Sequence, residues 1–252
     1  MLHYIRLLVF IILTTIAAIV FTTPLNILYY IFRISKQHKI LIFFGRLTLK
    51  SILLIIKYIY NIDYKINGLE HLEELKNTPC IIAAKHQSFY ETILLPMILL
   101  DYNIAGILKQ ELIHLPFYGY ALGAFNNIFI DRKKPKKAMT KALLEIKRIL
   151  DNNNPMSLYI FPEGTRTDIG DDTQYKKGIL SLLYKKYNLP IIPMGLNSGL
   201  YFKYATSKPK KTGTIILEFC KPIPPGIKDD NLLLSTVKSA IENKTNELTQ
   251  QL

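Results

Sequence analysis

Residues 80–100 read CIIAAKHQSFYETILLPMILL, and this stretch decides how the chain folds. Its first part, residues 80–84, is a short apolar run typical of a buried strand, and its last part, residues 90–100, has the length of a helix. A short segment that contains His86 joins the two. The order of strand, turn and helix predicts a βα unit in which His86 follows the carboxyl end of the strand.

The same alternation continues along the chain after Tyr60. Short apolar runs predict further strands, and segments with helical spacing predict helices between them. We therefore expect an α/β fold with a mixed, largely parallel sheet flanked by helices. The further predicted strands are 104–108, 128–131, 157–161, 191–194 and 214–219, and the further predicted helices are 136–150, 176–188 and 231–248.

The N-terminal part differs in character from the rest of the chain. Residues 7–32 include no charged residue, and at about 1.5 Å rise per residue such a helix could cross a hydrocarbon core roughly 30 Å thick. Pro24 is expected to interrupt it. Residues 40–60 place Arg46, Lys50 and Lys57 among Leu and Ile at helical spacing, as in an interfacial helix. We predict a two-helix membrane anchor over residues 1–60 and an α/β domain over residues 61–252.

A secretory signal peptide is the alternative interpretation of the N-terminal segment, because Arg6 precedes the apolar stretch and the pair Ala17-Ala18 is small. However, the uncharged run continues past any plausible cleavage site. Arg33, Lys36 and Lys39 then follow at once, as expected for a cytoplasmic flank. This pattern favours an anchor with the α/β domain on the cytoplasmic face of a membrane.

The charge of the chain indicates a polyanionic partner. Its 252 residues include 32 Lys and Arg against 19 Asp and Glu, which gives a formal net charge of +13. Anionic lipid headgroups and nucleic acid are both candidates. Because no nucleic-acid-binding motif is recognisable and the basic residues accompany an apolar anchor, we predict anionic membrane lipids and no nucleic acid.

Cysteines and histidines give little sign of a metal or a disulfide framework. Cys80 and Cys220 both lie in apolar, strand-like runs, although a single bond between them stays open. The histidines outside the central motif show no metal-ligand spacing. These are His3, His38, His71 and His114. We expect neither a metal nor another cofactor.

His86 and Glu91 form the first candidate catalytic pair. On a regular helix, side chains five residues apart point about 140° away from each other, so the two can meet only if the chain turns between them. Residues 87–89 can supply that turn. A carboxylate that accepts the imidazole N–H would fix the tautomer and stabilise the imidazolium formed when the other nitrogen takes a proton. The alternative is an accidental pair without function.

Two arginines follow predicted strands and suit an anionic substrate. Arg132 ends a strand beside Asp131, and Arg166 ends the turn FPEGTR at residues 161–166. The planar guanidinium donates two parallel bonds to a phosphate. Within the turn, Gly164 permits close backbone approach and Glu163 can accept from a hydroxyl. The alternatives are a salt bridge for Arg132, a solvated loop acid for Glu163 and a surface cation for Arg166.

Taken in order over residues 66–221, these elements resemble the glycerolipid acyltransferase family, specifically the bacterial 1-acyl-glycerol-3-phosphate acyltransferases. The family's Phe-Pro-Glu-Gly-Thr-Arg block is matched letter for letter at residues 161–166. Its His-x4-Asp block resembles residues 86–91, its block ending in Arg resembles 129–132, and its apolar strand with a central Pro resembles 191–194. Glu91 departs from the usual Asp, and its extra methylene moves the carboxylate by about 1.5 Å.

The resemblance implies direct acyl transfer without a cysteine or serine nucleophile. His86, oriented by Glu91, would act as general base on the free sn-2 hydroxyl of lysophosphatidic acid, which attacks the thioester of acyl-CoA or acyl-ACP and forms phosphatidic acid. It also implies a bacterial inner membrane and a role in phospholipid biosynthesis. The residues implied for holding the acceptor are Lys109, Arg132, Glu163, Gly164, Thr165 and Arg166. The alternatives are the same chemistry on another lysophospholipid or glycerol 3-phosphate, or a non-catalytic basic protein that binds membrane lipid.

Overall fold

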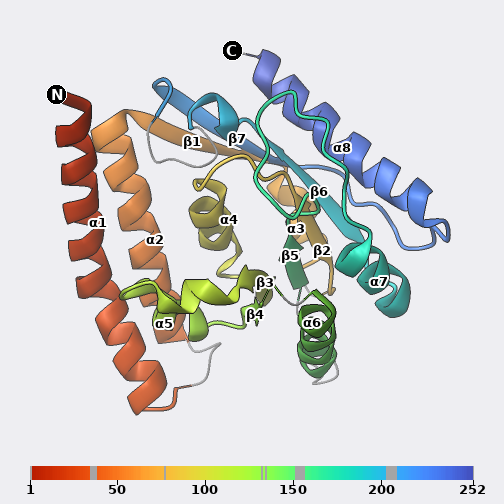
Figure 1. The fold of residues 1–252 in the computed structure, drawn as a ribbon, viewed down its shortest axis with the longest axis horizontal. Coiled ribbons are helices and arrows are strands. Elements are labelled where there is room, and N and C mark those ends of the chain that lie inside the picture. Colours follow the sequence, from red (N-terminus) through yellow and green to blue (C-terminus); the bar gives the residue numbers. More distant parts are fainter. Residues whose placement is uncertain are drawn as a thin grey trace. The chain divides into compact units, whose positions relative to one another are not determined.

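The computed structural model describes residues 2–34, 39–76, 78–131, 133, 135–150, 157–202 and 209–251 (Figure 1). The chain forms two compact units, each made of two separate stretches. The first comprises Met1–Asp63 and Thr92–Ala142, and the second comprises Tyr64–Glu91 and Leu143–Leu252. The boundary predicted after residue 60 separates a membrane anchor from the α/β domain, and it stays a prediction.

The first unit begins with two long helices that pack against each other. Helix α1 (Leu2–Asn26) runs into a π-helical turn, η1 (Ile27–Ile31), and α2 (Lys39–Tyr60) returns along it. The stretch Tyr4–Ile31 has a mean hydropathy of 2.5 and enough length to cross a membrane, which is a weak indication of membrane association.

The expected interruption at Pro24 is wrong, because α1 continues through this residue to Asn26. The next residue, Leu25, is buried in a cluster with Leu41, Ala121 and Ala124. This tertiary packing keeps the segment helical although the proline donates no backbone hydrogen bond.

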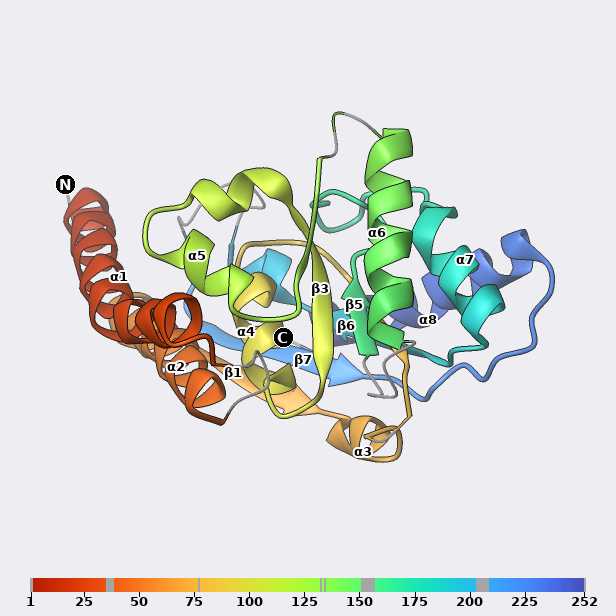
Figure 2. The same cartoon turned by 90° about the horizontal axis from the view of Figure 1, so that it is seen from below.

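The rest of the first unit contains a pair of parallel strands and short helices. Strand β3 (Ile104–Lys109) pairs with β4 (Ile128–Ile130), and Lys109 lies opposite Ile130. Between them come η2 (Gln110–His114) and α5 (Tyr118–Gly123), which the sequence did not predict. Helix α5 lies beside α1 (Figures 1 and 2). The Tyr118 hydroxyl donates to the carbonyl of Thr14 at 2.8 Å. Such short helices depend on tertiary contacts of this kind.

The second unit is built on strands in the order β1-β7-β6-β2-β5. Strand β2 (Ile81–Ala84) is parallel to β5 (Ser157–Ile160) on one side and to β6 (Ile191–Leu196) on the other. Strand β7 (Gly213–Phe219) is antiparallel to β6. The prediction of an α/β fold with a mixed, largely parallel sheet is confirmed, and the six predicted strands are found with small shifts at their ends.

Strand β1 (Ile62–Asn67) was missed by the sequence analysis for a physical reason. It lies at the edge of the sheet beside β7 only, and it alternates polar Asp63, Lys65 and Asn67 with less polar residues. A half-exposed edge strand needs no continuous apolar run. Helix α3 (Leu69–Glu73), which follows it, is too short to leave a periodic signal.

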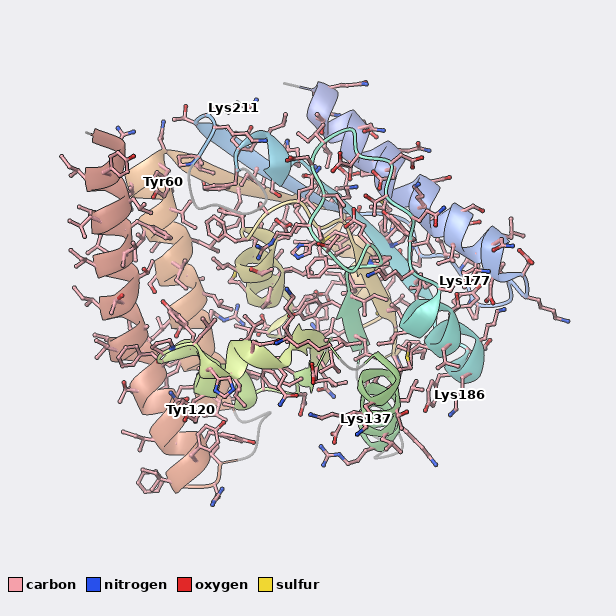
Figure 3. The ribbon with its side chains drawn as sticks, in the orientation of Figure 1. Tyr60, Tyr120, Lys137, Lys177, Lys186 and Lys211 are labelled. Atoms are coloured by element: carbon pink, nitrogen blue, oxygen red, sulfur yellow. The ribbon has the colours of Figure 1, made fainter. Side chains whose placement is uncertain are left out.

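The remaining predicted helices are found within two residues of the expected ends. They are α4 (Glu91–Leu99), α6 (Pro135–Leu150), α7 (Gly178–Tyr187) and α8 (Asp230–Gln250). Helix α8 begins where the Asp229 side chain accepts from the backbone N–H of Leu232 at 2.7 Å, and it packs on β6. Lys177 and Lys186, at either end of α7, extend from the surface (Figure 3).

Candidate active site

His86 lies just beyond the carboxyl end of the buried strand β2, as the sequence predicted. Its backbone N–H donates to Glu163 Oε2 at 2.8 Å, and its carbonyl accepts from the backbone N–H of Thr167 at 2.9 Å. Its ring stacks on Phe161, with centroids 4.0 Å apart. The side chain keeps 14% of its surface exposed. The imidazole is therefore firmly held and still reachable from solvent.

Glu91 reaches the His86 ring because the chain turns between them. The residues from Lys85 to Tyr90 are not helical, and α4 begins only at Glu91. His86 Nδ1 lies 3.1 Å from Glu91 Oε1. The same oxygen accepts from the backbone N–H groups of Gln87 and Ser88, both at 2.5 Å. The longer side chain of Glu is thus accommodated by a tight turn at residues 87–88.

The second oxygen of Glu91 is held by two hydroxyl groups. Oε2 accepts from Ser88 Oγ at 2.6 Å and from Ser198 Oγ at 2.9 Å, and the carboxylate is completely buried. Burial alone would raise the pKa of Glu91, but the hydrogen bond and charge of His86, together with the bonds from Ser88, outweigh it and hold the pKa below its ordinary value.

The Glu91 carboxylate is therefore ionised at neutral pH and can only accept hydrogen bonds. His86 must then donate through Nδ1–H, so that its Nε2 carries the lone pair. This arrangement of an oriented imidazole with a free basic nitrogen can remove a proton from a hydroxyl group.

Glu163 lies in the FPEGTR turn after β5, and its carboxylate is bound by the protein itself. Oε1 is 2.7 Å from Lys85 Nζ and accepts from Thr167 Oγ1 at 2.8 Å, while Oε2 accepts from the His86 backbone. The side chain is buried. These contacts orient the loop around His86, and the predicted contact of Glu163 with an acceptor stays a prediction.

Lys85 was missed by the sequence analysis. Its side chain is 2% exposed and lies between the carboxylates of Glu163 and Glu242. Burial lowers the pKa of an ammonium, but these two carboxylates outweigh this effect and raise the pKa of Lys85 above its ordinary value. The available signal was a lysine directly after an apolar strand, a position where a charge must find a buried partner.

The other residues of the turn differ in exposure. Gly164 has φ +71°, a conformation that favours glycine, and a Cβ at this position would lie 2.7 Å from Lys176 Nζ. Thr165 is exposed and Arg166 is half-buried. Lys176, which lies outside the turn, thus places its ammonium beside Gly164, and the turn itself carries the Arg166 guanidinium; both are cations that suit an anionic group.

The two other predicted phosphate-binding residues are Lys109 and Arg132. Lys109 is the exposed last residue of β3. Arg132 lies outside the described residues, directly after Asp131. The roles of both stay predictions.

Within the described ranges, no group of three or more His, Cys, Asp and Glu side chains could hold a metal ion. Cys80 and Cys220 are free.

Comparisons with known proteins connect this geometry with a family. A sequence model of the family described as Acyltransferase matches residues 63–197, which include His86, Glu91 and the FPEGTR turn. A 1-acyl-sn-glycerol-3-phosphate acyltransferase from Pseudomonas aeruginosa is 34% identical over 149 residues, which cover 59% of this chain. The enzyme of the same name from Helicobacter pylori is 36% identical over 161 residues, which cover 62% of this chain.

The chain spans 55% and 65% of the length of these two relatives. A solved structure supports the fold: the crystal structure of the 1-acyl-sn-glycerophosphate (LPA) acyltransferase PlsC from Thermotoga maritima aligns with a TM-score of 0.61. The alignment covers 93% of this chain and 97% of that one, at 20% sequence identity.

Proposed function

The chain belongs to the acyltransferase family, and we propose that it transfers a fatty acyl group from acyl-CoA or acyl-ACP to the sn-2 hydroxyl of 1-acyl-glycerol-3-phosphate, forming phosphatidic acid. One observation carries this proposal: the His86 ring is held by the buried carboxylate of Glu91 at 3.1 Å, directly beside the FPEGTR turn. The names of the bacterial relatives support the choice of acceptor.

In the proposed mechanism, His86 Nε2 removes the proton from the acceptor's hydroxyl as its oxygen attacks the thioester carbonyl. The resulting imidazolium is stabilised by Glu91, whose carboxylate receives the Nδ1–H bond. When the tetrahedral intermediate collapses, the carbon–sulfur bond breaks and the imidazolium returns its proton to the departing thiolate. The new ester bond remains on the glycerol, and the enzyme is restored.

The phosphate of the acceptor would be bound by arginine and lysine side chains. Arg166, at the end of the turn that packs on His86, is the first candidate, since a guanidinium can donate two bonds to one phosphate. Lys109 and Arg132 are the further candidates. Glu163 is assigned to holding the His86 backbone, which its contacts with Lys85 and Thr167 support.

We propose a membrane location with the active site on the cytoplasmic face. The apolar stretch Tyr4–Ile31 provides the anchor. Helix α2 adds the exposed Lys50 for contact with anionic headgroups, while Arg46 pairs with Asp101 and Lys57 pairs with Asp63. An acceptor with an acyl chain resides in the same membrane, so an anchored enzyme meets its substrate there.

The decisive experiment measures acyl transfer from acyl-CoA and from acyl-ACP to 1-acyl-glycerol-3-phosphate by the purified protein. We expect activity in the parent and a loss of about 10²- to 10⁴-fold in His86→Ala, because a general base contributes that much. Arg166→Ala should raise KM for the acceptor. His114→Ala, which changes an exposed histidine of η2, is the matched control.

Three outcomes would redirect the proposal. Full activity of His86→Ala would exclude the mechanism. Activity restricted to glycerol 3-phosphate or to another lysophospholipid would keep the mechanism and change the acceptor. A parent protein without any transferase activity that still binds anionic vesicles would favour a lipid-binding function.

A further inference from the structure

Helix α8 lies beyond the residues that match the family, but one of its side chains reaches the loop that carries His86. The carboxylate of Glu242 faces Lys85, whose Nζ lies 2.8 Å from Oε1 and 3.1 Å from Oε2. Lys85 directly precedes His86 in the chain. The contact therefore joins α8 to the carboxyl end of β2, on which α8 packs (Figure 1).

Further bonds extend this contact into a continuous network. Glu242 Oε1 also accepts from the Tyr175 hydroxyl at 3.0 Å. On its other side, Lys85 Nζ lies 2.7 Å from Glu163 Oε1, and Glu163 Oε2 accepts from the His86 backbone N–H at 2.8 Å. Every link from Glu242 to His86 is thus a hydrogen bond or an ion pair.

The charges make this network sensitive to Glu242. The Lys85 ammonium, which is 2% exposed, pairs with two carboxylates. That of Glu163 is fully buried, and that of Glu242 is 22% exposed. Lys85 cannot leave Glu163 without uncovering a buried charge, so the two must move together. The two oxygens of Glu242 fix the position of Nζ. Without them, Lys85 would settle against Glu163 alone, and the carboxylate that holds the His86 backbone would shift with it.

We propose that Glu242 is a positioning residue for acyl transfer. Through Lys85 and Glu163, it holds His86 where the imidazole contacts Glu91. This inference rests on the proposed function, because it takes His86 as the general base. A displacement of about 1 Å at a reacting group can cost roughly 100-fold in rate. Glu242 can therefore control the reaction without touching a substrate.

The test is the steady-state kinetics of the protein in detergent with acyl-CoA and 1-acyl-glycerol-3-phosphate. Each kcat is divided by the amount of folded protein, which size exclusion and thermal unfolding measure. Glu242→Ala should lower kcat by roughly 10- to 100-fold while both KM values change less than about twofold. Glu242→Asp keeps two acceptor oxygens and Glu242→Gln keeps one for Lys85 and Tyr175, so each should recover part of the lost kcat. A merely structural role would lower the yield of folded protein and leave kcat per folded molecule unchanged.

Glu247→Ala is the matched control, because Glu247 lies on the same helix, is exposed and pairs with Lys244. Its kcat should equal that of the parent. If Glu242→Ala also keeps the parent kcat in an active preparation, the positioning role is wrong.

A double-mutant cycle with Lys85→Ala tests whether the effect passes through the lysine. Because both changes break the same contact, adding Glu242→Ala to Lys85→Ala should lower kcat little further. If the fold losses in kcat of the two single variants multiply in the double variant, the effect of Glu242 does not pass through Lys85. A parent protein that transfers no acyl group would instead overturn the proposed function, and the positioning role with it.

Discussion

The loop of residues 85–91 and the turn of residues 161–167 each bring one buried glutamate to His86, but the two carboxylates hold different parts of it. Glu91 binds the imidazole nitrogen, whereas Glu163 binds the backbone N–H. Glu91 is surrounded by hydroxyl and amide donors, and Glu163 is paired with a lysine. The Glu91 carboxylate, which contacts the ring, can stabilise the positive charge of the imidazolium. The Glu163 carboxylate, which accepts from the backbone N–H, can only hold His86 in position.

The largest effect in this comparison is expected for Glu91→Gln. The amide keeps the shape of the carboxylate and one acceptor oxygen, but it carries no charge, so the imidazolium formed during the reaction loses its stabilisation. We expect kcat to fall by about 10³-fold or more, as for loss of the orienting acid in a catalytic triad. Steady-state kinetics at equal folded abundance measure it.

A loss in Glu91→Gln no greater than that of a matched Glu163→Gln variant would contradict the division of roles. Ser198→Ala serves as a graded comparison, because it removes one donor to Glu91 Oε2 and leaves the contact with His86 in place.

The second effect combines stability with chemistry, because Glu163 holds the His86 backbone N–H and also pairs with Lys85. Glu163→Ala leaves Lys85 with Glu242 as its remaining carboxylate partner and the His86 N–H without its acceptor. We expect the free energy of unfolding to fall by about 3 kcal/mol, near the low end for breaking a buried ion pair. Denaturant unfolding in detergent measures it. An unchanged stability would mean that the pair contributes nothing net, as some buried pairs do.

The local part of this site could be predicted from sequence. The apolar run before His86 placed it at a strand end, and the turn at residues 87–89 was the expected condition for contact with Glu91. The FPEGTR block likewise indicated where a second cluster of polar residues lies. These features depend on neighbours within a few positions, which propensity and spacing describe well.

The long-range part could not be predicted. Ser198 meets Glu91 across 107 residues of sequence, and Glu242 meets Lys85 across 157. A serine or a glutamate on a helix or turn carries no sign of such a partner, because only the packing of β6 and α8 against β2 brings them together. The fold shows the same limit: edge strand β1 and Pro24 were misjudged where tertiary contacts decide.

The third prediction uses pH to separate the two glutamates. Because the pKa of Glu91 lies below its ordinary value, ionised Glu91 stabilises the folded state above the unfolded pKa, and this contribution is lost as the pH falls through the folded pKa. Each unit of depression corresponds to about 1.4 kcal/mol.

The measurement is the free energy of unfolding of the parent and of Glu91→Gln from neutral to acidic pH. The parent should lose more stability than the variant on acidification, since the variant has no carboxylate to protonate at this position. Parallel curves would show that the His86 contact does not depress the pKa of Glu91. Ser88→Ala should give an intermediate curve, because it removes one of the bonds that lower this pKa.

The smallest effect is expected at the thiols, and it tests whether any other group shares the chemistry of the His86 pair. Burial raises the pKa of Cys220 to about 11 and also raises that of Cys80. Since the thiolate is the reactive form, both should react slowly with maleimide at neutral pH. The double variant Cys80→Ala, Cys220→Ala should keep kcat per folded protein, although loss of the buried Cys80 sulfur can cost about 1 kcal/mol of stability. Rapid labelling that abolishes transfer would mean that a thiol enters the reaction, and the proton chemistry could then no longer be assigned to His86 and Glu91 alone.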